Sequence, residues 1–256
     1  MATDERESSP AFVILGGAGG IGRATAARLL ARGDRVLLAG RTPGRLEAAA
    51  GELRCPTTVL DATDIAAVET CFAQALDRFG RLDGAVNCVG SLLLKPAHLT
   101  SPGDWESTLK TNLTSAFATV RGAAKTMRKG GGSVVLMSSA AARVGLPSHE
   151  AIAAAKAGVI GLTLSAAASY AGSGLRVNAV APGLTKTGMT ESIWSRAAAA
   201  AASEEMHALG RLGEPGDIAS AIVWLLDPSN GWVTGEVLSI DGGLSHIRPA
   251  TRRKAN

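Results

Sequence analysis

Three residues at helical spacing could meet a substrate from one face of a helix: His149, Ile152 and Lys156. Positions i, i+3 and i+7 project the same way, so we expect the side chains to align if the helix extends back to His149. An imidazole titrates near neutrality and can donate or accept a proton, whereas isoleucine has no proton to give. His149 is therefore a candidate acid–base group, although a histidine that only lines the pocket or caps the helix fits the same pattern.

A glycine-rich segment follows the first apolar run of the chain. Gly16, Gly20, Ile21 and Gly22 lie where that run passes into a helical pattern. Glycine lets the backbone approach a pyrophosphate, and the N-terminus of the following helix favours its negative charge. A plain tight turn would use the same glycines, but the strand–turn–helix context favours nucleotide binding.

The end of the second apolar run indicates which nucleotide binds. NAD-binding sheets carry an acidic residue near this point, which binds the ribose 2′-hydroxyl. This chain has Ala39-Gly40-Arg41 instead, and a guanidinium suits the 2′-phosphate of NADP. We therefore favour NADP(H) over NAD(H), although Arg41 and Arg45 also fit exposed arginines at a helix start. Asp61, just after the third run, is placed to meet the adenine edge.

The candidate site residues are far apart in the sequence, so the fold must bring their segments together. Short apolar runs alternate with helical patterns, which is typical of a parallel sheet covered by helices on both faces. We predict one α/β domain with a doubly wound (Rossmann) sheet of about seven strands and a ligand site at their carboxyl ends. Strands are predicted at 12–15, 36–39, 58–60, 85–87, 133–137, 175–180 and 236–240, and helices at 21–31, 45–53, 65–79, 105–127 and around 152–156.

The same patterns set the predicted domain boundaries. Residues 1–10 form a flexible N-terminus, residues 11–246 the single dinucleotide-binding and catalytic domain, and residues 247–256 a basic C-terminal tail. Residues 187–210 form an insertion of helical pieces that contains a run of alanines. Such a segment fits a substrate lid, and it fits a surface helix of low complexity equally well.

The composition excludes several function classes. The chain has 256 residues, of which 46% are hydrophobic, and a net charge of +4 with no basic stripe that would predict nucleic-acid binding. No apolar run approaches the ~20 residues that span a bilayer, and the polar start lacks a signal region. The three cysteines show no metal spacing and suit reduced thiols. We expect a cytoplasmic protein with a small-molecule substrate, no metal, no nucleic acid and no membrane.

With further motifs added, the chain resembles the short-chain dehydrogenase/reductase superfamily over nearly its whole length. The turn glycines match the three motif glycines of that superfamily. The other matching positions are Asn87 and Gly90 after the fourth strand, Asn112, Ser139, Lys156, Pro182-Gly183 with Thr187, Arg211 to Pro215, and Asp241-Gly242-Gly243.

The resemblance implies a role for each catalytic position. Lys156 would bond the nicotinamide ribose, Ser139 would hold the substrate carbonyl, and Asn112 would anchor a proton-relay water. The family's acid is a tyrosine four residues before the lysine, where this chain has Ile152. The divergent enoyl-reductase branch of the superfamily places its tyrosine seven residues before the lysine, which is the register of His149. The resemblance also implies that Pro182-Gly183 and Thr187 touch the nicotinamide end and that the protein is a homotetramer or homodimer.

We interpret the sequence as an atypical NADPH-dependent oxidoreductase that transfers a hydride to a ketone or conjugated carbonyl. A general acid contributes ~10²–10⁴ in rate while enzymes accelerate by ~10⁶ or more, so losing the tyrosine slows such an enzyme without silencing it. His149, water or the substrate itself would then handle the proton. The alternatives are a non-catalytic NADP(H)-binding relative that acts as a sensor or partner subunit, and a lyase or isomerase on this fold.

Overall fold

The structure, a computed structural model, describes residues 9–248. Most of the expected N-terminal segment and of the basic tail therefore lies outside the described residues. The helices and strands, in chain order, are β1 (Ala11–Leu15), α2 (Gly20–Ala31), β2 (Arg35–Gly40), α3 (Pro43–Leu53), β3 (Thr57–Val59), α4 (Ile65–Phe79), β4 (Gly84–Asn87), α5 (Pro102–Leu109), α6 (Ser115–Met127), β5 (Gly132–Met137), α7 (Glu150–Tyr170), β6 (Leu175–Pro182), α8 (Glu191–Trp194), α9 (Ala197–Met206), α10 (Pro215–Leu226) and β7 (Val237–Ile240).

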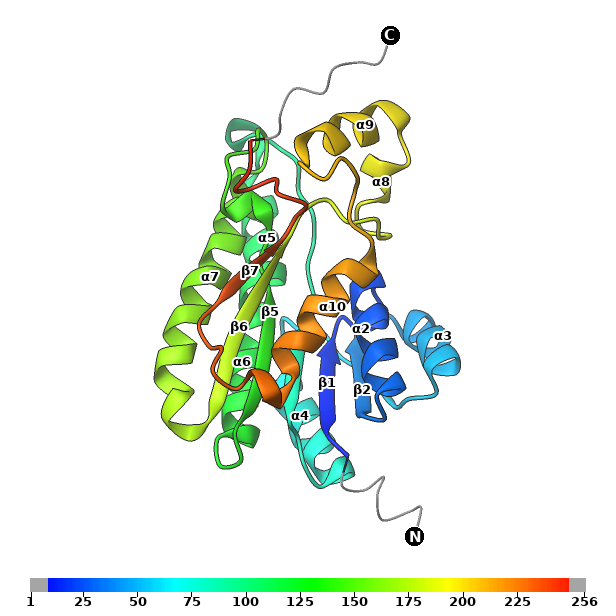
Figure 1. Ribbon diagram of the computed structural model, residues 1–256, viewed down its shortest axis with the longest axis vertical. Helices are drawn as coiled ribbons and strands as arrows, with labels where there is room; N and C mark the ends of the chain where they lie inside the picture. Colours follow the sequence, from blue (N-terminus) through cyan, green and yellow to red (C-terminus); the bar gives the residue numbers. More distant parts are fainter. Residues whose placement is uncertain (1–8, 249–256) are drawn as a thin grey trace.

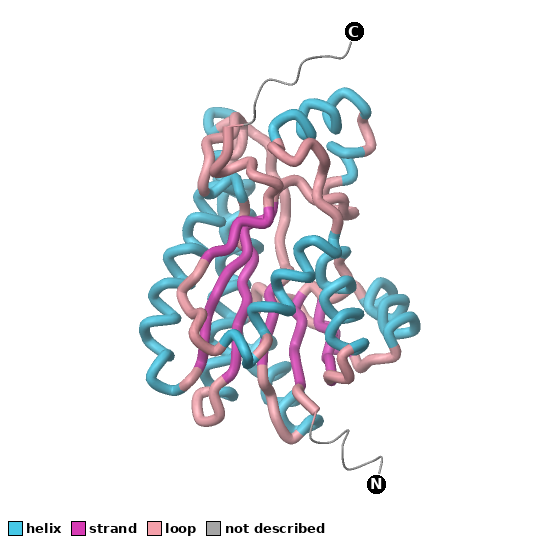
Figure 2. Tube along the Cα trace, viewed as in Figure 1, coloured by secondary structure: helices cyan, strands magenta, loops and turns pink. Residues whose placement is uncertain are grey.

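Seven parallel strands form one sheet in the order β3-β2-β1-β4-β5-β6-β7. The chain builds outward from β1 to β3 and then returns to place β4 on the other side of β1, with helices on both faces (Figures 1 and 2). The predicted doubly wound sheet is therefore confirmed. The point where the strand order reverses is where such sheets bind their ligands.

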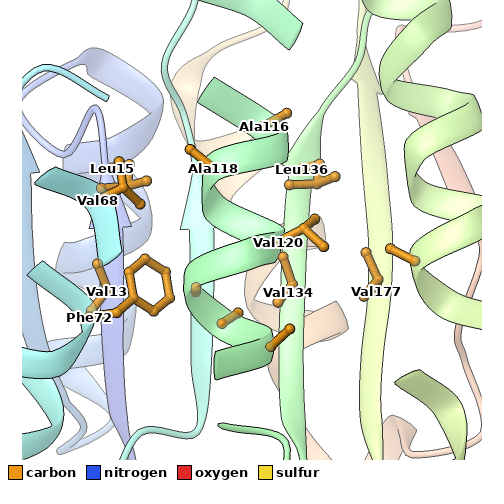
Figure 3. Packing of buried hydrophobic residues seen from close by; sticks show 14 of the residues in the cluster. Val13, Leu15, Val68, Phe72, Ala116, Ala118, Val120, Val134, Leu136 and Val177 are labelled. Atoms are coloured by element: carbon orange, nitrogen blue, oxygen red, sulfur yellow. The ribbon is translucent and has the colours of Figure 1, made fainter. Parts of the chain in front are cut away.

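Alternation of side chains along the strands divides the core into two layers. In β1, Val13 and Leu15 face one layer, and Phe12 and Ile14 face the other. Figure 3 shows the first layer, in which Phe72 of α4 packs near the β1 residues of that layer. The second layer lies between the sheet and the helices α2 and α10. A sheet buried on both faces explains why its strands are continuous apolar runs.

Local capping signals fix the ends of α4, which was predicted at 65–79 and is observed there. The side chain of Asp64 accepts hydrogen bonds from the backbone N–H groups of Ala66 and Ala67, and the helix ends at Gly80 with φ +71°. Such an N-cap typically contributes ~1 kcal/mol, and glycine tolerates the left-handed conformation at the end.

The long helix predicted at 105–127 is present, because α5 and α6 follow each other without a non-helical gap. A π-helical turn, Lys110–Thr114, lies between them and was not predicted. The helix α10 was not predicted, although a capping box of Glu214 and Asp217 marks its start. The predicted helical insertion at 187–210 contains α8 and α9.

The helix α7 corrects the expectation that no apolar run approaches the length of a membrane span. With the turn that follows it, Glu150–Ser173 is long and apolar enough by length and composition alone, and 44% of that stretch is buried inside the protein. Much of the helix is alanine and glycine, so its apolar length is missed when only large apolar side chains are counted. Because α7 packs against β6, we describe it as a core helix of the domain.

Candidate active site

A cavity of about 700 Å³ lies at the carboxyl ends of the strands, where the loops that follow β1 to β6 converge. Its position agrees with the crevice expected where the strand order reverses. All but one of the residues selected from the sequence line it, namely Gly16, Gly20, Ile21, Gly22, Arg41, Asp61, Gly90, Asn112, Ser139, His149, Ile152, Lys156, Pro182, Gly183 and Thr187.

The glycine turn leaves no room for side chains. Gly16 has φ +73°, and a Cβ there would lie 2.8 Å from the carbonyl carbon of Cys88. A Cβ on Gly22 would lie 2.6 Å from the carbonyl oxygen of Gly16. The helix α2 begins at Gly20 after Gly19 with no side-chain cap and no acidic residue in its first turn. Its leading N–H groups therefore remain available to an anion, and the turn fits a dinucleotide pyrophosphate.

One end of the cavity carries most of its charged side chains. Arg41 and Arg45 come from the segment after β2, and Asp61 follows β3. The carboxylate of Asp61 accepts the N–H of Thr63 at 2.9 Å. This hydrogen bond lowers the pKa of Asp61, with a smaller contribution from Arg41. The pair of side chains expected for the adenosine half of NADP is therefore brought together here.

Lys156 is buried where α7 meets the end of β5. Its Nζ donates to the carbonyl oxygen of Met137 at 2.8 Å, and the Oγ of Ser138 donates to the carbonyl oxygen of Lys156 at 2.9 Å. Burial lowers the pKa of Lys156 from 10.5 to about 8. Ser139, which follows Ser138, lines the cavity, and its Oγ accepts a hydrogen bond from the N–H of Ala141 at 3.2 Å. Two hydrogen bonds, one donated by Lys156 and one accepted by it, thus join the end of β5 to α7 beside the hydroxyl of Ser139.

Asn112 is 1% exposed and lies in the π-turn between α5 and α6. Its Nδ2 donates to the carbonyl oxygen of Thr108 at 3.0 Å and to the Oγ of Ser91 at 2.9 Å, and its Oδ1 accepts the N–H of Ser91 at 3.1 Å. Both amide hydrogens are therefore used inside the protein. The side chain fixes Ser91 on the cavity wall, and π-turns of this kind often occur at functional sites.

Asn87 is the selected residue that does not line the cavity. Its Nδ2 donates to the hydroxyls of Thr119 at 3.0 Å and Ser115 at 3.3 Å, both on α6, and its Oδ1 accepts the N–H of Val89 at 2.8 Å. The pleat of β4 turns the side chain toward the helix layer. The side chain of Asn87 therefore ties β4 to α6, and the cofactor contact expected from the sequence stays a prediction.

His149 lies at the N-cap of α7, because the helix begins at Glu150. The Nδ1 atom lies 2.7 Å from the carbonyl oxygen of Pro147, which can only accept, so Nδ1 donates this hydrogen bond. Ser148 has φ +61°, a conformation uncommon outside glycine, and its carbonyl accepts the N–H of Lys95 at 2.8 Å. Backbone strain of this kind gathers at functional sites.

Ile152 lies one turn before Lys156 and lines the cavity with a side chain that is 4% exposed. These two residues share the expected helical face. His149 reaches the same cavity from the cap position instead of from a further helical turn.

His207, to which the sequence assigned no role, links the end of α9 to the loop after β6. It follows α9 and is 3% exposed. Its Nδ1 donates to the carbonyl oxygen of Ser203 at 2.6 Å, and its Nε2 accepts the N–H of Leu184 at 3.2 Å. A Cβ on Gly183 would lie 2.5 Å from that Nε2. Both partners are backbone groups, which no side-chain motif reveals.

Two further features of the site were missed. The indole N–H of Trp194 donates to the carbonyl oxygen of Thr187 at 2.9 Å, which anchors α8 beside the cavity. Cys88 lines the cavity near Lys156, and burial raises the pKa of its thiol to about 12. Among residues 9–248, no group of three histidine, cysteine or acidic side chains could hold a metal ion.

Comparisons with known proteins agree with this geometry. The family model described as enoyl-(acyl carrier protein) reductase matches residues 16–245. D-threitol dehydrogenase of Mycolicibacterium smegmatis is 33% identical over 246 residues, which cover 94% of each chain. The 3-oxoacyl-(acyl-carrier-protein) reductase of Thermotoga maritima is 34% identical over 240 residues, 91% of this chain and 96% of the relative. A solved variant of actinorhodin polyketide ketoreductase with NADPH has a TM-score of 0.88 at 26% identity, over 94% of this chain and 99% of the other.

The matched region includes both the glycine turn at its start and the loop after β7 at its end. The named relatives are dehydrogenases and reductases with the same overall length. The cavity provides a dinucleotide cradle beside a buried lysine and a serine hydroxyl. The chain therefore belongs to the short-chain dehydrogenase/reductase superfamily and is an NAD(P)-dependent oxidoreductase.

Proposed function

We propose that the protein is an NADPH-dependent reductase of a ketone or conjugated carbonyl that works without the tyrosine acid of its family. The observation that carries the proposal is that one cavity holds the glycine turn, Ser139 and Lys156, while Ile152 lines it with hydrocarbon alone. A bound NADPH would supply the hydride. Orientation of the substrate and movement of the proton fall to the side chains of the protein.

Ser139, Lys156 and Asn112 each have a role in this proposal. The hydroxyl of Ser139 polarises the substrate carbonyl, which stabilises the negative charge that develops on oxygen. The ammonium of Lys156 holds the nicotinamide ribose. Asn112 shapes the π-turn, whose displaced backbone positions a water. The remaining cofactor contacts would come from Gly16, Gly20, Ile21, Gly22, Gly90, Pro182, Gly183 and Thr187.

The proton in this proposal comes from His149, from water or from the substrate. The carbonyl of Pro147 accepts a hydrogen bond from Nδ1 in both charge states of the ring, so proton exchange is confined to Nε2. This geometry favours His149 among the three sources. A positioned general acid contributes ~10²–10⁴ in rate, which sets the expected effect of its removal.

The test is NADPH oxidation by the purified protein with a panel of aliphatic ketones, aromatic ketones and enones. We expect turnover with part of the panel, and we expect His149→Ala to lower kcat at least about tenfold. His98→Ala, a substitution of an exposed histidine outside the cavity, is the matched control. Binding of NADPH without any oxidation across the panel contradicts the proposal, and an unchanged rate in His149→Ala removes the histidine from the mechanism.

A second candidate is a non-catalytic NADP(H)-binding protein that acts as a sensor or partner subunit. The observation that favours it is the buried hydrocarbon of Ile152 at the place of the family's acid. The same oxidation panel separates the two functions, because a sensor binds the cofactor with full affinity and consumes none of it.

We also propose a homotetramer or homodimer in the cytoplasm. The exposed face of α7 supports assembly, because Gly161, Leu164 and Ala168 lie outward there and allow close packing of a second helix. The free thiols of Cys55 and Cys71 are buried and suit a reducing compartment.

A further inference from the structure

Charge is segregated within the cavity. Arg41, Arg45 and Asp61 follow β2 and β3, and these strands form one edge of the sheet. The opposite end is closed by segments that follow β4 to β7. In the part of the chain that the structure describes, these segments contribute one ammonium, from Lys156, and the imidazole of His149.

Apolar side chains line the opposite end of the cavity. We call these side chains the apolar wall: Leu94, Leu146, Ile152, Met189, Ile193 and Met206. Three of its members lie at the mouth of the cavity, where Leu94 is 44%, Met189 48% and Met206 44% exposed. Large apolar side chains that stay exposed around a concave site mark a surface that an apolar ligand covers.

Lys95 and Lys186 also lie on these segments, but they do not line the cavity. Lys95 pairs with Asp104 at 2.7 Å, and Lys186 pairs with Glu214 at 3.0 Å. Among residues 9–248, the ammonium of Lys156 is therefore the only lysine or arginine charge that lines this end and could meet a carboxylate or phosphate on a substrate. Removing an ionised group from water without a partner is costly, whereas burying methylene groups is favourable.

We infer that the substrate is an uncharged, mostly hydrocarbon ketone or enone. Its carbonyl lies at Ser139 and its hydrocarbon body lies along the apolar wall toward the mouth. That the substrate has a carbonyl rests on the proposed function, whereas its uncharged, hydrocarbon character concerns binding alone. Met189 and Met206 have flexible, polarizable side chains, so the mouth accepts hydrocarbon bodies of different shapes.

The test measures binding by calorimetry in the presence of NADP⁺, which cannot reduce a ketone. The ligands are straight-chain methyl ketones from 2-hexanone to 2-decanone, each matched to the oxo-carboxylate of equal chain length. We expect the Kd of the ketones to fall about fourfold with each added methylene and the carboxylates to bind at least about tenfold more weakly. A flat ketone series, carboxylates that bind as tightly as ketones, or no binding of either series overturns the inference.

This readout keeps the inference separate from the proposed function. A protein that binds the ketone series with the expected slope but never oxidises NADPH contradicts the reductase and leaves the substrate class standing. A protein that reduces ketones but binds the carboxylates equally well contradicts the substrate class alone.

A charged side chain introduced at the mouth of the cavity provides a second test of the inferred substrate class. Met206→Lys puts an ammonium on the apolar wall, and we expect it to shift the ratio of carboxylate to ketone affinity toward the carboxylate by about threefold. Leu209→Lys is the matched control, because Leu209 is 71% exposed close by in the chain and does not line the cavity. Equal shifts in the two variants show that general charge, and not the wall, governs the affinity.

Discussion

Ile152 and Lys156 lie one turn apart on α7 and are buried to a similar degree, 4% and 5% exposed, yet only the lysine can exchange a proton. We predict that Ile152→Tyr raises kcat for ketone reduction by at least about tenfold, because a hydroxyl beside Lys156 can act as a general acid. Ile152→Phe controls for the size of the ring. If tyrosine and phenylalanine give equal rates, proton supply does not limit the reaction.

The low pKa of the buried Lys156 leads to a prediction about how cofactor binding depends on pH. Burial disfavours the charged form and lowers its pKa to about 8, so the ammonium is present below that pH and lost above it. We predict that the Kd for NADPH rises as the pH increases through about 8, measured by fluorescence titration. Lys156→Arg stays charged and should lose this step. A step that persists in the arginine variant belongs to another group.

Arg41 tests the choice of cofactor. Because a hydrogen bond to a charged group contributes about 1.5–3 kcal/mol, Arg41→Ala should weaken NADPH binding by about tenfold or more and leave NADH binding nearly unchanged. Arg45→Ala shows whether the second arginine of this end shares the 2′-phosphate. Equal losses for NADPH and NADH in Arg41→Ala would falsify the preference for NADP(H).

At the scale of the elements, the buried imidazole of His207 links residues 187–210 to the loop after β6. We predict that His207→Phe, which keeps the ring and removes both nitrogens, makes residues 187–210 more sensitive to limited proteolysis. The backbone N–H of Leu184 then loses its acceptor, so KM should rise more than kcat falls. The exposed His98→Phe is the control. Unchanged proteolysis shows that packing alone holds the lid.

The sequence predicted elements best where a local signal decides the structure. The bounds of α4 follow from Asp64 and Gly80, and the buried strands follow from continuous apolar runs. The capping box at Glu214 was present in the sequence but was not used, so α10 was missed. The π-turn left no such signal, because it depends on how α5 and α6 pack at the cavity.

The same division applies to the site. Residues that match short motifs, such as Gly16, Ser139 and Lys156, were found and lie together. His207 escaped detection because both of its partners are backbone groups, the carbonyl of Ser203 and the N–H of Leu184. Asn87 was selected by its motif, but the direction of its side chain is set by the pleat of β4 and by the hydroxyls of α6.

At the scale of the whole molecule, α7 runs along one flank of the protein (Figure 1). Its exposed residues include Gly161, Leu164 and Ala168. Leu164 among them is 54% exposed. We predict that Leu164→Glu shifts the protein to a smaller species in size-exclusion chromatography with light scattering, because the carboxylate would be buried in the interface. Val59→Glu changes a residue that is 56% exposed on the edge strand β3 and serves as control. Identical masses for both variants and the parent protein argue against assembly through α7.

The paired bonds between Lys156 and the end of β5 have a consequence for engineering. The carbonyl of Met137 accepts a hydrogen bond from the ammonium of Lys156, and the hydroxyl of Ser138 donates one to the carbonyl of the same lysine. Neither bond involves the side chain at position 152. We therefore expect that position 152 can be substituted while these two hydrogen bonds are kept. Acids of graded strength can be installed there one at a time, and the resulting rates compare proton donors against a lysine that stays in place.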